Sequence, residues 1–220
     1  MSEVIKASGR TAVRRVPRNA VFDRESIYAM LDEGLVCHVG IVDEGQPFVI
    51  PMLYARDGDT LYLHGSVGSR MVKALGGGEP CCVTVTLVDG LVLARSLLHH
   101  SMNYRSVVIL GRGRALTTRD EKNRALQRLT EGVIPGRWND AREPSDKELD
   151  ATGVVEFPLE ECSAKVRTGP PNDDEADYDL PHWAGVIPLG LSVGTPIPDE
   201  RVAPGTTVPE YISAYRRPKR

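Results

Sequence analysis

The feature that most constrains the fold of this chain is an alternation of apolar and polar side chains with a period of two residues, which begins near Leu35. Two turn sequences, Asp43 to Gln46 and Arg56 to Asp59, interrupt the alternation. Such a pattern, broken by turns that contain Gly and Asp, is typical of half-buried strands joined in hairpins. The strands predicted in this part are residues 35–42, 47–55 and 60–65. The sequence therefore predicts an antiparallel β meander.

Helical spacing replaces the alternation in three places. Helices are predicted at residues 23–33, from about residue 66 to residue 75, and at residues 118–130, and three glycines at 76–78 end the second one. Further strands are predicted at residues 81–88, 91–94, 104–117, 154–157 and 164–167. Asp89-Gly90 is expected to form the hairpin turn between the first two of these, and the glycines at 111 and 113 indicate a bend. Many short strands with few helices favour a single mainly β barrel over a doubly wound sheet.

Composition divides the chain into three parts. Residues 1–22 are expected to form an amino-terminal arm, residues 23–168 the barrel domain, and residues 169–220 an extended carboxyl-terminal segment. The last segment is rich in Pro, Gly and Asp, with Trp183 and Ile187 as isolated apolar anchors, so it is not expected to fold alone. We expect it to pack on the barrel or on a partner subunit.

Charge and hydropathy exclude several classes of partner. The formal net charge is −3 with 26% charged residues, which lacks the broad basic excess of a nucleic-acid-binding protein. Short basic runs, which include Lys6, Lys219 and Arg220 at the two ends, are expected to be solvated. No stretch approaches the roughly 18 apolar residues of a membrane span, and the amino end has no signal-peptide pattern. We therefore expect a cytoplasmic protein with neither a nucleic-acid nor a membrane partner.

The cysteines and histidines do not have the spacing of a metal site. Cys37, Cys81, Cys82 and Cys162 lie in apolar strand-like runs, as expected of buried, reduced thiols. The pairs Cys37-His38, Cys81-Cys82 and His99-His100 lack the Cys-x-x-Cys spacing that lets two thiolates share one zinc ion. No metal site is predicted.

The segment from His64 to Lys73 carries the most chemical information. It follows a strand and begins a helix, where free backbone N–H groups and the helix dipole favour an anion. Ser66 and Ser69 add hydroxyl donors, Arg70 and Lys73 add positive charge three residues apart, and Gly65 permits a close approach. These residues alone also fit a plain helix cap at Ser69 with two solvated cations.

Four strings, in this order, resemble the pyridoxamine-phosphate-oxidase-like split-barrel family, in particular its nitroimidazole-resistance reductase and flavin-nucleotide-binding branch. They are Phe48 to Met52, His64 to Leu75, Asn103 to Val108 with Gly111, and Trp183 to Pro188. The resemblance covers roughly residues 23–188 and implies a six-stranded antiparallel split barrel that binds FMN at the interface of a homodimer. The family's Ser-Arg-Lys string reads Ser69-Arg70-Met71 here, so Lys73 would have to substitute for the missing cation.

The resemblance also implies roles for individual residues. The flavin ring would lie against the backbone of Ile50, Pro51 and Met52. The cofactor-binding residues that it implies are Ile50, Pro51, Met52, His64, Gly65, Ser66, Ser69, Arg70, Lys73, Tyr104, Arg105, Ser106 and Trp183. His64, which alternation places on the strand face shared with Tyr62, is the candidate catalytic residue.

Three functions remain open at this point. The first is an FMN-dependent oxidoreductase that NADH or NADPH reduces and that passes hydride or electrons to a small acceptor, such as a nitroaromatic or a quinone. The second is a flavin store or sensor without turnover. The third keeps the barrel and changes the ligand to haem or a deazaflavin, with His64, His99 or His100 as axial ligands of a haem.

Overall fold

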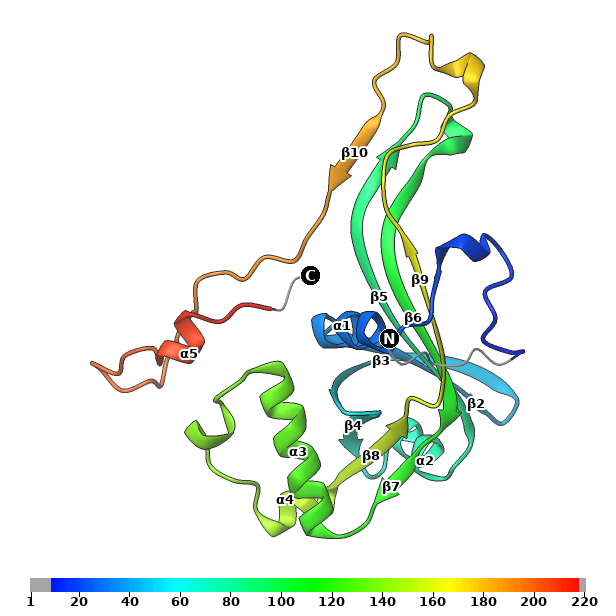
Figure 1. The fold of residues 1–220 in the computed structure, drawn as a ribbon. Helices are drawn as coiled ribbons and strands as arrows, with labels where there is room; N and C mark the ends of the chain where they lie inside the picture. Colours follow the sequence, from blue (N-terminus) through cyan, green and yellow to red (C-terminus); the bar gives the residue numbers. More distant parts are fainter. Residues whose placement is uncertain (1–8, 218–220) are drawn as a thin grey trace.

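The computed structural model describes residues 9–217 as an antiparallel sheet with helices packed on its faces (Figure 1). The strands are β1 (Ala20–Val21), β2 (Val36–Asp43), β3 (Gln46–Asp57), β4 (Thr60–Ser66), β5 (Pro80–Leu93), β6 (Ser101–Arg112), β7 (Arg114–Leu116), β8 (Thr152–Pro158), β9 (Glu161–Arg167) and β10 (Gly185–Pro188). The helices are α1 (Arg24–Glu33), α2 (Arg70–Gly76), α3 (Arg119–Val133), α4 (Asp146–Ala151) and α5 (Glu210–Ser213). The described strands run in the order β1-β9-β6-β5-β2-β3-β4-β8-β7, and β10 pairs with β5.

The predicted mainly β architecture is confirmed. The sheet has ten described strands where six were expected, and β1, β7 and β10, of two to four residues, account for three of them.

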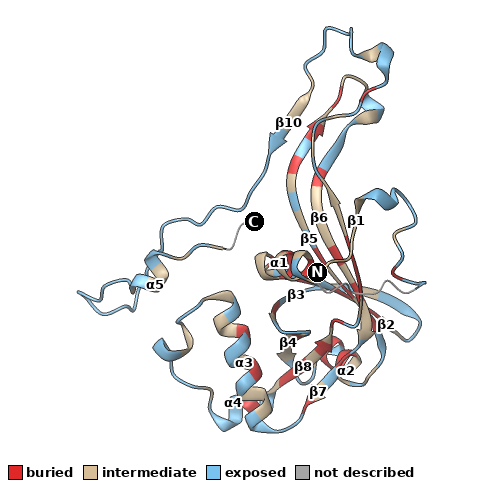
Figure 2. Ribbon diagram, viewed as in Figure 1, coloured by how far each residue is buried: buried red, intermediate tan, exposed pale blue. Residues whose placement is uncertain are grey.

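The predicted meander is confirmed as β2, β3 and β4, and its alternation decides which side chains enter the core. On β4, Leu61 and Leu63 are fully buried, whereas Tyr62 and His64 face the other way and are half-buried. Figure 2 shows this alternation of buried and exposed residues along the strands of the barrel. The core is therefore enclosed by the inner faces of the sheet and by α1 and α2.

Local capping explains where the helices begin. Asp23 accepts a hydrogen bond from the Ser26 amide, and Thr118 forms a capping box with Glu121, so α1 and α3 begin where the sequence predicts. The bend predicted at the glycines is confirmed at Gly113. There β6 ends, β7 turns to pair with β8, and a Cβ atom would lie 2.6 Å from a backbone oxygen.

The predicted hairpin at Asp89-Gly90 is wrong. β5 runs through both residues, with a register irregularity between Val88 and Gly90, because β6 pairs with it from Pro80 to Val92. Gly90 serves a different purpose, since a Cβ atom there would lie 2.9 Å from the carbonyl oxygen of Ile187 on β10. The two long strands therefore continue past the barrel as a projecting hairpin, here named the finger (residues 88–104), at the top of Figure 1.

The segment that follows β9, here named the tail (residues 169–217), runs to the tip of the finger and returns (Figure 1). On its return β10 pairs with β5, from Gly185 opposite Leu93 to Pro188 opposite Gly90. The tail then leaves the finger and ends with α5 beside the end of α3, where the Tyr215 hydroxyl donates to the Val133 carbonyl over 2.7 Å. The described tail thus contacts its own chain along the finger and at the end of α3.

Several smaller expectations can be compared with the structure. α4 was not predicted. Lys6, Lys219 and Arg220 lie outside the described residues. Cys37, Cys81 and Cys162 are buried free thiols, and Cys82 is half-buried. None of the described helices has the length and apolar character needed to span a bilayer.

Candidate functional site

The barrel opens at β3, because its two edges are paired over different lengths of the strand. β2 pairs with β3 from Gln46 to Leu53, and β4 pairs with β3 only from Tyr54 to Asp57. Within the described residues no strand pairs with the other edge of β3 before Tyr54, so its outward backbone groups remain available to a ligand. Ile50, Pro51 and Met52, which were predicted to contact the flavin ring, lie on this edge.

The predicted phosphate segment lies between the end of β4 and the start of α2. Ser69 is the N-cap of α2, and its Oγ accepts a hydrogen bond from the Val72 amide over 3.2 Å. Ser66 Oγ accepts from the Gly68 amide over 3.3 Å. Gly65 is packed closely, since a Cβ atom would lie 3.1 Å from the Val72 side chain. Ser69 therefore caps α2, which begins at Arg70 and not near residue 66 as predicted, and residues 66–68 are exposed.

Arg70 turns from the start of α2 toward the hairpin between β2 and β3. Its Nε lies 2.7 Å from Asp43 Oδ2, and its guanidinium stacks over the Phe48 ring at 4.2 Å from the centroid. The side chain remains 50% exposed, so its two terminal nitrogens can still bind an anion. Neither contact was predicted, because Asp43 had been placed only in a turn.

Lys73 does not lie with Arg70. It lines a separate cavity of about 380 Å³ with Lys122, between α2, the end of β7 and the start of α3. The Lys122 ammonium donates to the Leu149 carbonyl over 2.9 Å, and the Lys73 side chain is exposed. The two cations that were predicted to act on one phosphate therefore point to different places, and Arg70 is the one beside the β3 edge.

His64 has the strand face that was predicted, and its environment is unusual. Nδ1 is buried and has no hydrogen-bond partner among the described residues. Burial lowers the pKa of His64, because the protein interior disfavours the imidazolium form. The side chain is therefore a neutral, partly buried imidazole next to the predicted phosphate segment.

The predicted flavin-edge residues on β6 lie apart from this opening. Two strands, β5 and β2, separate β6 from β3, so the path along the sheet from β6 to β3 covers three strand spacings, about 14 Å. Alternation turns Arg105 inward and Tyr104 and Ser106 outward, so they cannot all contact one group. Within a single chain these three residues and the β3 edge do not form one site.

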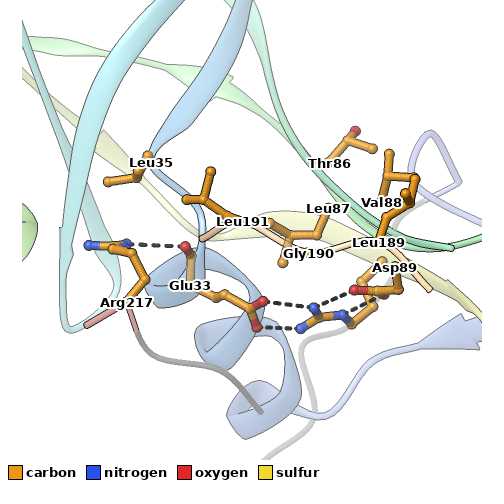
Figure 3. Close-up of a pocket in the computed structure, with 11 residues that line it drawn as sticks. Glu33, Leu35, Thr86, Leu87, Val88, Asp89, Leu189, Gly190, Leu191 and Arg217 are labelled. Atoms are coloured by element: carbon orange, nitrogen blue, oxygen red, sulfur yellow. Dashed lines mark hydrogen bonds and ion pairs between the residues drawn. The ribbon is translucent and has the colours of Figure 1, made fainter. Parts of the chain in front are cut away.

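Arg105 is instead the centre of an ion-pair cluster that also lines a cavity of about 390 Å³ under the tail (Figure 3). Its guanidinium makes bidentate contacts with Glu33 at 2.6 and 2.9 Å and with Asp89 at 2.7 and 2.9 Å. Leu189 and Leu191 of the tail form the opposite wall. The cluster joins α1, through Glu33, to the irregular part of β5, through Asp89, and to β6. The sequence analysis did not identify this cluster.

Trp183 lies in the tail, on the way back from the tip of the finger. Its indole is 69% exposed and lies close to Gly185, where a Cβ atom would lie 2.9 Å from the ring. It does not reach the β3 edge of its own chain. A role at the flavin site therefore requires a second copy of the chain.

The sequence matches the pyridoxamine 5'-phosphate oxidase family over residues 23–166, and the chain belongs to that family. Its structure is similar to that of the flavocytochrome Anf3 from Azotobacter vinelandii, with 44% sequence identity, a TM-score of 0.91, and 96% of this chain and 99% of that chain covered. The FAD and haem binding protein from Mycobacterium smegmatis is 36% identical, with a TM-score of 0.85 and 88% and 95% of the two chains covered.

A protein of Bacteroides thetaiotaomicron described in connection with 5-nitroimidazole antibiotic resistance is more distant. It is 27% identical, with a TM-score of 0.57 and with 67% of this chain and 86% of that chain covered. No curated protein sequence matches the chain. The predicted family is confirmed, and the two more similar structures are those of proteins named for flavin or haem binding.

Proposed function

We propose that this protein is a homodimeric flavin-binding redox protein that also binds haem. The observation that carries the flavin is the unpaired edge of β3 from Gln46 to Leu53, which lies beside the start of α2 and the Arg70 guanidinium. The haem is supported by the likeness to a flavocytochrome and to an FAD and haem binding protein over almost the whole chain.

The residues at the opening fit a flavin nucleotide. Backbone groups of Ile50 to Met52 can bind the polar edge of the ring. Ser66, Ser69 and the terminal nitrogens of Arg70 can bind a phosphate. When bound, the flavin supplies hydride and electron transfer, while the protein holds and orients it. Sequence analysis favoured FMN, whereas the Mycobacterium smegmatis relative favours FAD, and we propose FAD.

His64 is proposed to act at the flavin as a neutral imidazole. The lowered pKa keeps its second nitrogen available as a hydrogen-bond acceptor near neutral pH, so it can orient a substrate or take up a proton there. We further propose that a nicotinamide reduces the flavin and that a nitroaromatic- or quinone-like molecule accepts its electrons.

The dimer is proposed because the outer face of β2 and β3 is apolar and exposed. Val36, Val42, Val49 and Leu53 project from the same side of the two strands and are 39–67% exposed. Exposed apolar area of this kind marks an interface. A second copy on this face could bring Ser106, Tyr104 or Trp183 to the β3 edge, which a single chain cannot do.

The experiment is a spectrum of the purified protein, followed by identification of the released cofactors and by steady-state oxidation of NADH or NADPH with quinone and nitroaromatic acceptors. We expect about one FAD per chain, a Soret band after addition of haem, and a dimer by light scattering. Arg70→Ala should weaken flavin binding about tenfold, as the loss of one charge-assisted contact implies. Arg119→Ala, a surface arginine paired with Asp146 and Asp150, is the matched control.

Three results would decide against parts of the proposal. A colourless protein that takes up no flavin contradicts it altogether. A flavin spectrum without acceptor-dependent oxidation favours the flavin store or sensor. A released cofactor with deazaflavin absorbance replaces FAD with that coenzyme.

A further inference from the structure

His99 lies at the tip of the finger, in the single turn of 3-10 helix at Leu97–His99, and its side chain is half-buried, with 27% exposed. Its Nδ1 has no hydrogen-bond partner among the described residues and lies 4.0 Å from Asp173 Oδ1. That distance is about 1 Å longer than a hydrogen bond. Nδ1 is therefore directed at a carboxylate, and Nε2 is left on the opposite side of the ring.

Asp173 is held rigidly where it meets His99. Its side chain is completely buried, and Oδ1 accepts from the amides of Arg95 and Ser96 over 2.9 and 3.3 Å. Oδ2 accepts from Arg95 Nη1 over 3.0 Å. Burial opposes ionisation, but the hydrogen bonds from Arg95 and Ser96 prevail and hold the pKa of Asp173 below its usual range. The carboxylate is thus a fixed anion that can fix the ring of His99.

Metal-ligating histidines usually donate their other ring N–H to a carboxylate, which fixes the tautomer and raises the basicity of the ligating nitrogen. His99 and Asp173 have the parts of that arrangement, and they come from opposite sides of the finger tip. By contrast, Nδ1 of the neighbouring His100 bonds to the Ser96 carbonyl over 3.0 Å and the side chain is exposed. Of these two histidines, only His99 has a buried carboxylate facing Nδ1.

The surface around His99 is apolar in a way that the fold of one chain does not explain. Leu97 and Leu98, next to His99 in the sequence, are each 88% exposed, and Leu91 and Met102 on the finger are 45% and 43% exposed. Exposed apolar area of this kind is expected where a large apolar ligand or a partner covers it. A porphyrin has the size and apolar faces to cover such a patch.

We propose that His99, oriented by Asp173, is an axial ligand of the haem iron through Nε2, and that Leu97 and Leu98 contact the macrocycle. This assignment rests on the haem part of the proposed function and goes beyond it by naming the ligand and the residue that positions it. Asp173 is a positioning residue and not a ligand, because it faces Nδ1 of His99 and not the Nε2 side on which the iron would bind.

The test compares haem binding by the full-length wild-type protein, His99→Ala, His64→Ala and His100→Ala, after addition of haem to the flavin-loaded protein. The readouts are haem stoichiometry by the pyridine haemochrome assay, the Soret position, and the electron paramagnetic resonance spectrum of the ferric protein. Only His99→Ala should lose most of the haem or change to a high-spin spectrum, and added imidazole should restore the wild-type spectrum. Thermal unfolding shows whether each variant is folded, and flavin content adds the same check for His99→Ala and His100→Ala.

Asp173→Asn separates positioning from structure. The asparagine carbonyl can still accept from the two amides, but the negative charge is lost. We expect the haem to be retained with a raised reduction potential, because the ligating imidazole becomes less electron-rich. An unchanged potential in a folded, haem-loaded variant contradicts the role given to Asp173.

The remaining outcomes overturn the assignment in distinguishable ways. Haem bound by His99→Ala with the wild-type stoichiometry and spectrum overturns it and leaves the proposed function intact. A wild-type protein that binds flavin but no haem overturns the haem part of the proposed function and the assignment together.

His99, Asp173 and Asp177 also place their ligand atoms within 4.8 Å of one another. If zinc binds and both His99→Ala and Asp177→Asn abolish it while haem binding is unchanged, the tip is a divalent-cation site and not a haem site.

Discussion

The barrel and the finger share strands β5 and β6, yet they differ in what covers their apolar side chains. In the barrel, Leu61 and Leu63 are fully buried under α1, α2 and the neighbouring strands. On the finger and its tip, Leu97 and Leu98 remain almost fully exposed. The barrel therefore encloses its own core, whereas the finger and the tail present apolar surface that another molecule or a cofactor has to cover.

This difference implies that the barrel supplies most of the stability of the fold, whereas the finger serves binding. A two- or three-stranded extension with few buried side chains contributes little to folding by itself. Its length and exposed apolar residues are then explained by what binds to it.

The sharpest test replaces leucine by alanine in both regions. Leu63→Ala removes a fully buried side chain and should lower the free energy of unfolding by about 3–5 kcal/mol. Leu98→Ala, the same chemical change on the finger, should change it by less than about 0.5 kcal/mol. Urea denaturation of the cofactor-free protein measures both. Similar losses at the two positions would contradict the division.

The junction of the two regions is held by Arg105 with Glu33 and Asp89. Arg105→Ala should cost about 2–3 kcal/mol, because it leaves two largely buried carboxylates without their partner. The double variant Arg105→Ala with Glu33→Gln should cost less than the sum of the two single changes. Additive losses in urea denaturation would show that the cluster is not the unit that the geometry indicates.

How much the sequence predicts depends on how local the cause is. The meander, the caps at Asp23 and Thr118 and the bend at Gly113 follow from side-chain alternation, capping chemistry and glycine geometry within a few residues. α4 was missed although its Ser145 and Glu148 form a capping box, since six residues are too few to show a helical period.

The wrong hairpin at Asp89-Gly90 has a non-local cause. The dipeptide favours a tight turn, but continuous pairing with β6 and the close approach of β10 at Gly90 outweigh that local preference. The predicted site was affected in the same way. The helix cap at Ser69 could be predicted from the neighbouring residues. The direction of the Arg70 side chain could not, because the partner that turns it away from Lys73 is Asp43, on a different hairpin.

The end of the tail should have an intermediate effect. Arg217 Nη2 donates to the carbonyls of Asp32 over 2.6 Å and Gly34 over 2.8 Å at the end of α1, and Nη1 donates to Gly132 on α3 over 3.1 Å. Arg217→Ala should lower stability by about 1–2 kcal/mol and speed hydrogen exchange in the tail. Arg216→Ala is the control, since within residues 9–217 the Arg216 side chain donates only to the adjacent Tyr215 carbonyl. Equal exchange rates in the two variants would show that Arg217 does not fix the tail.

The smallest effect is expected from the pH dependence of His64. Because burial lowers its pKa in the folded protein, the unfolded chain takes up a proton at this residue at a higher pH than the folded chain does. Stability that is present above the pKa of an unfolded histidine is therefore lost as the pH falls through the folded pKa.

His64→Gln removes this contribution, so its unfolding free energy should fall less than that of the wild type between pH 7 and pH 5. Above pH 7.5 the imidazole is neutral in both states, and the two curves should run parallel. Curves that stay parallel down to pH 5 would show that the imidazole is hydrated in the folded barrel, which would contradict the half-buried position given to it beside the flavin.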